Sequence, residues 1–125
     1  MTITIVIHTI GGFSEIGGTF DSQFSLRMVW YDKRLSYHYL RDKPKTLSTK
    51  TIDKIWFPAM KFENTKTKVM IKPDEKANLE VRKEGRGTHA EDHDGENKLV
   101  YSGKDNLLSF ERFYPLTFQC SYNLR

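Results

Sequence analysis

The stretch FDSQFSLRMVWYDKRLSY, residues 20–37, decides the fold class of this chain. Five of its apolar side chains share one parity: Phe20, Phe24, Leu26, Met28 and Trp30. The opposite parity is mostly polar: Asp21, Gln23, Ser25, Arg27 and Val29. A period of two residues predicts a β-strand with one buried face. Trp30 is therefore expected in the core, and Arg27 is expected to point away from it.

Further short strands are expected on both sides of this stretch. Alternating β-branched or apolar residues predict them over residues 2–10, 66–72, 79–82, 98–102 and 110–122. No window shows the sustained spacing of three and four residues that indicates an amphipathic helix. Short strands separated by turn signals favour an all-β fold, a β-sandwich rather than a barrel or an α/β unit.

Length and composition indicate one ordinary globular domain over residues 1–125, with 38% hydrophobic and 29% charged residues. The formal charge of +4 is spread along the chain and interleaved with acids, so we read it as background. The apolar run from Ile3 to Ile10 is too short to span a membrane, and no signal peptide is visible. Cys120 is the single cysteine, which excludes an intrachain disulfide.

Three other classes of function fit the residues poorly. Residues 88–97 contain imidazoles and carboxylates, but glycines flank them and the zinc hydrolase and calcium-loop patterns are missing, so we expect a solvated hairpin and no metal. Neither Cys120 nor any serine lies in a catalytic motif, so we expect no enzyme and no cofactor. Nucleic-acid binding would need exposed rings, whereas the rings of residues 20–30 share the core parity.

Three motifs together suggest a family. They are WYDKRL at residues 30–35, IWFP at 55–58 and FYPL followed by Gln119 at 113–119. Their order resembles the extracellular ligand-binding domain of the pentameric Cys-loop neurotransmitter-gated ion channels, and the form of the first motif is closest to the anion-selective branch gated by glycine, γ-aminobutyric acid or glutamate. The resemblance covers essentially the whole chain.

The resemblance implies an immunoglobulin-like twisted β-sandwich, of which this chain is about the first two thirds. It also implies an agonist site between neighbouring subunits of a pentamer on the extracellular side of the plasma membrane. The membrane would be reached only through a transmembrane part that is not in this chain. Two partners follow, a small amino-acid-like neurotransmitter and the adjacent subunits.

The resemblance also suggests ligand-binding residues. Arg27 falls where related anion channels carry an arginine that binds the agonist carboxylate, and a guanidinium suits that role. The alternative is a solvated arginine paired with Asp21 or another surface carboxylate. Ser25 stands where relatives often have an aromatic ring, and Lys61 stands where they place a ring near the agonist amine. Both departures put recognition of the usual agonists in doubt.

The last motif departs most from the family. Phe113, Pro115 and Gln119 match a loop that couples agonist binding to the pore in the resembled receptors. The disulfide that closes this loop would join positions matching Leu107 and Ser121, and neither residue is cysteine. Such a closure would add about 3 kcal/mol of stability. A divergent subunit, a pseudogene-like copy and a gene fragment would each explain these departures.

The leading hypothesis is thus a truncated ligand-binding domain that couples agonist binding to a pore, expected to conduct chloride. The alternative is a freestanding β-sandwich interaction or adhesion module that pairs through exposed edge strands. A nucleic-acid-binding sandwich is a third, weaker hypothesis, and it would lose binding steeply with salt.

Overall fold

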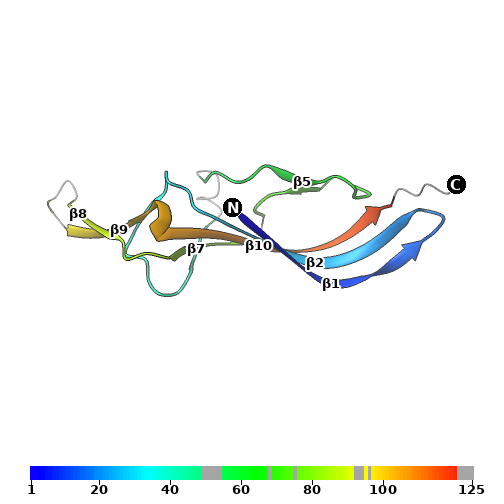
Figure 1. Ribbon diagram of the computed structural model, residues 1–125, viewed down its shortest axis with the longest axis horizontal. Helices are drawn as coiled ribbons and strands as arrows, with labels where there is room; N and C mark the ends of the chain where they lie inside the picture. The colour runs from blue at the N-terminus through cyan, green and yellow to red at the C-terminus, as the bar shows by residue number, and fades with distance from the viewer. Residues whose placement is uncertain (49–54, 68, 75, 92–94, 96, 121–125) are drawn as a thin grey trace.

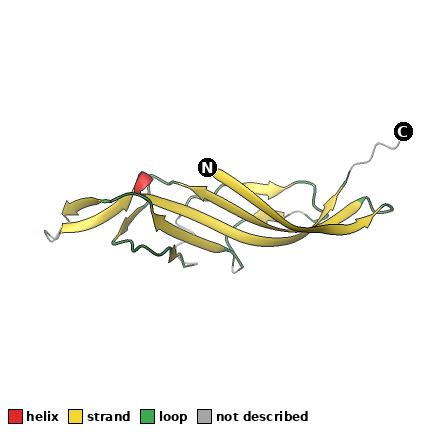
Figure 2. Ribbon diagram, turned by 60° about the horizontal axis from the view of Figure 1, so that its bottom comes forward, coloured by secondary structure: helices red, strands yellow, loops and turns green. Residues whose placement is uncertain are grey.

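The computed structural model describes residues 1–48, 55–67, 69–74, 76–91, 95 and 97–120. Its strands are β1 (Thr2–Ser14), β2 (Thr19–Trp30), β3 (Ser36–His38), β4 (Lys45–Thr46), β5 (Met60–Phe62), β6 (Val69–Ile71), β7 (Asn78–Lys83), β8 (Thr88–Glu91), β9 (Asn97–Ser102) and β10 (Asn106–Gln119). A short 3-10 turn, η1 (Gly103–Asp105), is drawn in red in Figure 2. The predicted all-β class is confirmed. In the described ranges, no helix has the length and apolar character that a membrane span requires.

The main sheet has five strands in the order β1-β2-β10-β7-β4, and every neighbouring pair is antiparallel. Its centre is the long pair of β2 and β10, which stay in register from Trp30 opposite Leu108 to Thr19 opposite Gln119. Figure 1 shows these strands as an elongated, twisted ribbon with β1 along one edge. Strands of L-amino acids twist in a right-handed sense, which accounts for the twist of this ribbon.

The alternation predicted for β2 is confirmed residue by residue. Leu26, Met28 and Trp30 are almost completely buried, with Trp30 only 3% exposed, whereas Arg27 is exposed. One face of β2 therefore forms the core, and the other face lies open to solvent. Because the period of a strand is two, a slip of one residue would reverse both placements.

A second, smaller layer covers the inner face of the main sheet. It consists of the hairpin of β5 and β6 together with the segment before it, and Figure 1 shows this hairpin running alongside the central strands. The ring of Phe57 meets Trp30 at 5.6 Å between centroids and Phe110 at 5.0 Å, both edge to face. Phe62 meets Phe24 in the same way at 5.5 Å. These aromatic contacts join the two layers and make up much of the core.

A tight ion pair ends β2. The carboxylate of Asp32 accepts hydrogen bonds from Arg34, from the backbone nitrogen at 2.9 Å and from Nε and Nη2 at 3.1 Å each. Asp32 is buried, and the side-chain hydrogen bond from Arg34 lowers the pKa of its carboxyl group. The spacing Asp-x-Arg thus builds a turn in which one arginine satisfies a buried carboxylate.

The hairpin predicted near residues 88–97 is present. Strands β8 and β9 pair from Thr88 opposite Val100 to Glu91 opposite Asn97, and β9 also pairs with β3. Figure 1 shows this sheet extending from one end of the molecule. The side chains of β8 are exposed, as a solvated hairpin requires. Residues 92–94 and 96, which include the remaining imidazole and carboxylates of the segment, lie outside the described residues.

Strand β1 differs from its prediction in length and in what covers it. It continues beyond residue 10 to Ser14, and the turn follows at residues 15–18. Its isoleucines Ile3, Ile5 and Ile7 lie on the same face as the buried side chains of β2, yet all three are exposed. The second layer packs against β2 and β10 and leaves the edge strand uncovered.

Candidate functional site

Two of the predicted ligand-binding residues lie on the outer face of the central strand pair, next to residues of β10. Arg27 of β2 lies directly opposite Glu111 of β10, and Ser25 lies directly opposite Phe113. Directly opposed residues of an antiparallel pair have Cβ atoms about 4.5–5.5 Å apart, so each pair can interact through its side chains. A guanidinium, a carboxylate, a hydroxyl and an aromatic ring therefore share one small patch, which we call the outer patch: Arg27, Ser25, Glu111, Phe113 and His8.

His8 enters the outer patch through an irregularity of β1. The register of β1 and β2 passes from Ile7 opposite Phe24 to Thr9 opposite Gln23, which leaves His8 as an extra residue. Its Nε2 lies 2.8 Å from the hydroxyl oxygen of Ser25, and its ring centroid lies 6.0 Å from that of Phe113. A bulge of this kind re-aims a side chain that regular pairing would place elsewhere. Here the re-aimed imidazole lies between the hydroxyl and the phenyl ring.

Arg27 keeps its charge available to a ligand. It is exposed, and among the described residues no ion pair or hydrogen bond of its side chain is found. The alternative partner Asp21 lies six residues away on the same strand, about 20 Å at strand rise. The Oδ1 of Asp21 instead accepts a hydrogen bond from the hydroxyl of Thr117 at 2.7 Å. The proposed pairing of Arg27 with Asp21 is therefore wrong.

Lys61 lies on the opposite side of the molecule from the outer patch. It is the middle residue of β5, where Met60 and Phe62 pack on the core and Lys61 is exposed between them. Since β5 covers the inner face of the sheet, Lys61 points away from Arg27 across both layers. One chain cannot bring these two residues to the same ligand. Two neighbouring chains could do so, which is the arrangement that the resemblance implies.

The segment expected to form a coupling loop is a strand. Phe113, Pro115 and Gln119 all lie in β10, paired with Ser25, Gln23 and Thr19 of β2. Along this strand the twelve steps from Leu107 to Gln119 span about 40 Å. Residues 113–119 are therefore extended, as the strand predicted over residues 110–122 requires, and they do not form the loop that the resemblance implies. Ser121 lies outside the described residues. A role of these residues in coupling stays a prediction.

Two members of the outer patch were missed from the sequence. Glu111 could have been found, because it alternates with the buried Phe110 and so belongs to the outer face of β10. Its position next to Arg27 depends on the pairing of two strands more than 80 residues apart in sequence, which no local pattern shows. The outward turn of His8 depends on the bulge, for which the sequence gives no signal.

The patch brings together groups that can contact the two charged ends of a small amino acid. A guanidinium offers parallel donors to a carboxylate, and exposed aromatic faces attract an ammonium group. Within the described ranges, no group of three or more histidine, cysteine, aspartate or glutamate side chains is placed to hold a metal ion.

Comparisons with known proteins identify a family and a relative. The family described as neurotransmitter-gated ion-channel ligand binding domain matches residues 1–90. The γ-aminobutyric acid receptor subunit rho-3 of Rattus norvegicus is 34% identical over 64 residues, which cover 51% of this chain and 14% of that subunit. The aligned part therefore spans a small share of the length of this curated relative. The family and the relative are both of neurotransmitter receptors, as the motifs led us to expect.

Proposed function

This chain belongs to the neurotransmitter-gated ion-channel ligand-binding domain family, and from that premise we propose that its outer patch binds the carboxylate end of a small amino-acid-like neurotransmitter. The family is one of receptors and not of enzymes. In this proposal the chain is the extracellular part of a subunit in the plasma membrane. Neighbouring subunits of a pentamer would contribute the other half of each site.

The observation that carries the proposal is the side chain of Arg27, which is exposed and, among the described residues, unpaired. Its guanidinium stands on a rigid central strand, faces solvent, and has no ion pair among the described residues. A permanent charge held ready in this way costs little reorganisation when a carboxylate arrives, which favours binding. The similarity to a γ-aminobutyric acid receptor subunit supports an amino-acid ligand. A chloride-conducting pore is part of the proposal.

The other side of each site would come from the layer that carries Lys61. Because Lys61 points away from Arg27 within one chain, the two residues can meet only across a subunit boundary. Lys61 would repel an ammonium group, so the amine of an amino-acid-like ligand would have to lie away from Lys61. Closure of the two faces on the ligand would then move β10, whose residues Phe113, Pro115 and Gln119 would transmit the change toward the pore.

The test is a chimeric receptor in which this chain is joined to the remaining strands and the pore of a related subunit. We expect Arg27→Ala to raise the half-maximal agonist concentration on the order of tenfold to a hundredfold, the effect of losing a charge-assisted hydrogen bond. Arg82→Ala is the matched control, since Arg82 is an exposed arginine on the same face, paired with Glu84 at 2.6 Å. Equal responses of the two variants would refute the role of Arg27.

A second candidate function is favoured by strand β1. It is an edge strand of 13 residues whose apolar side chains are uncovered, which is what an interaction module that pairs through its edge presents. The two functions differ in what disrupts them. Changes at the outer patch would impair only the receptor, and changes at the edge of β1 would impair only the module.

A further inference from the structure

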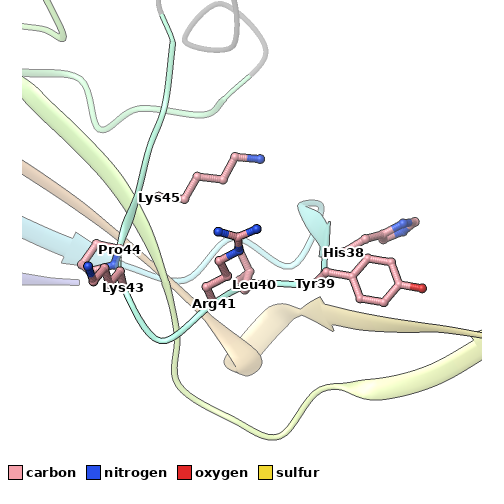
Figure 3. Close-up of a pocket in the computed structure, with 7 residues that line it drawn as sticks. All are labelled: His38, Tyr39, Leu40, Arg41, Lys43, Pro44 and Lys45. Atoms are coloured by element: carbon pink, nitrogen blue, oxygen red, sulfur yellow. The ribbon is translucent and has the colours of Figure 1, made fainter.

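A pocket of about 400 Å³ lies in the segment that connects β3 to β4, and none of its lining residues belongs to the outer patch. The residues that line it are His38, Tyr39, Leu40, Arg41, Lys43, Pro44 and Lys45. Figure 3 shows the chain bending round this hollow, with the side chains of Arg41 and Lys45 projecting to the same side. The enclosed space is large enough for a small polyatomic anion with its hydration shell.

The pocket carries an excess of positive charge. Three of its lining side chains are permanently cationic, and none of the described lining residues is acidic. The acid nearest in sequence, Asp42, is directed to another strand, where its Oδ1 lies 2.7 Å from the Nζ of Lys83 on β7. Among the described residues, this carboxylate is paired with a lysine that does not line the pocket. Like charges crowded in this way repel one another, and a bound anion would relieve that repulsion.

The frame of the pocket is fixed from two sides. Tyr39 has a positive φ of 54°, which is uncommon for a residue with a side chain, and its backbone nitrogen donates to the carbonyl of Leu99 on β9 at 3.0 Å. The next residue, Leu40, is buried in the core. Lys45 is placed by the ring of Tyr37, whose centroid lies 5.8 Å from its Nζ. A strained backbone held by its surroundings is the kind of feature that recurs at ligand clamps.

We propose that this pocket binds a tetrahedral oxyanion group, phosphate or sulfate, held between Arg41 and Lys45. The planar donors of Arg41 match two oxygens of such a group, and the ammonium of Lys45 supplies a second charge from across the hollow. Lys43 lies on the rim of the same pocket. This site shares no residue with the outer patch and does not depend on the function proposed for it.

The experiment is calorimetric titration of the 125-residue chain at low ionic strength with four probes: inorganic phosphate, inorganic sulfate, a phosphate monoester and a sulfated disaccharide. We expect saturable binding of at least one probe at one site per chain. Arg41→Gln and Lys45→Gln should each weaken that binding about fivefold to tenfold. Lys66→Gln removes one exposed charge near the far end of β10 and should change it by less than about twofold.

The results separate the sources of the anion. Binding of the inorganic ions as tight as that of the esters supports a site for the free anion, and binding of an ester alone supports recognition of the group on an organic carrier. Absence of saturable binding by all four probes would overturn the proposal. So would an equal loss in the Lys66→Gln variant, since it would indicate attraction to net charge alone. Circular dichroism of each variant checks that its fold is kept.

Discussion

Arg27 and Glu111 are direct cross-strand neighbours on the open face of the sheet, one on β2 and the other on β10. The described ion pairs do not include them, although opposed side chains on an antiparallel pair lie within reach of each other. The negative charge of Glu111 therefore acts on the guanidinium of Arg27 without forming an ion pair with it. A ligand carboxylate that approaches Arg27 must also approach Glu111.

Neutralising Glu111 should strengthen the binding of a carboxylate ligand. In the chimeric receptor we expect Glu111→Gln to lower the half-maximal agonist concentration about threefold, because it removes a like charge near the ligand. Concentration-response curves give the measurement, and Glu63→Gln, an exposed acid outside the main sheet, is the control. A rise in the half-maximal concentration would instead indicate that Glu111 contacts a positive group of the ligand.

Two phenylalanines three residues apart on β10 should differ sharply in their effect on stability. Phe110 is completely buried and meets Phe57 edge to face, whereas Phe113 is 47% exposed on the outer face. We expect Phe110→Ala to lower the free energy of unfolding by about 3–5 kcal/mol. Phe113→Ala should lower it by less than about 1 kcal/mol. Urea unfolding of both variants gives the comparison, and equal losses would mean that the assignment of the two faces is wrong.

The sequence predicted those features of the fold that depend on neighbouring residues. The alternation from Phe24 to Trp30 is a local property of an extended chain, so it correctly placed Trp30 inside and Arg27 outside. The Asp32 to Arg34 turn is equally local. The family could also be predicted, because its motifs are short stretches that are read directly along the chain.

Features that depend on long-range pairing were not predictable. Alternation predicted the strand over residues 110–122, but not its central place in the sheet, because Pro115 argues against a central strand. Strand β7 pairs with β10 only as far as Glu111, so Pro115 lies in a part of β10 where that partner has already ended. Likewise, Phe113 of β10 lies directly opposite Ser25, a neighbour that only the strand register reveals.

The ion pair of Asp74 and Arg112 should make stability depend on pH. Nε of Arg112 donates to both carboxylate oxygens at 3.0 Å, and this hydrogen bonding lowers the pKa of Asp74. The stabilisation is complete above the unfolded pKa, about 3.9. It is lost as the pH falls through the lowered folded value, because the unfolded chain takes up the proton first.

The measurement compares the parent chain with Asp74→Asn. At about pH 6 we expect the variant to be less stable by about 1 kcal/mol, a modest figure because the pair is partly solvated. The difference should shrink at about pH 3, where the carboxylate is protonated in the unfolded chain. Asp32 is common to both proteins and cancels from the comparison. A difference that stays constant between the two pH values would contradict the assignment.

Strand β1 should make the isolated chain self-associate. Residues 1–14 contain no aspartate, glutamate, lysine or arginine, and the strand exposes Ile5, which is 55% accessible, along an edge whose described pairing is with β2 alone. Long, uncharged edge strands of high β-propensity pair with copies of themselves. We expect Ile5→Lys to increase the monomer fraction in sedimentation velocity, because a charge on the edge opposes pairing. Gln23→Lys adds the same charge on the interior strand β2 and should leave association nearly unchanged. An equal effect of both lysines would indicate that net charge, and not the edge, controls solubility.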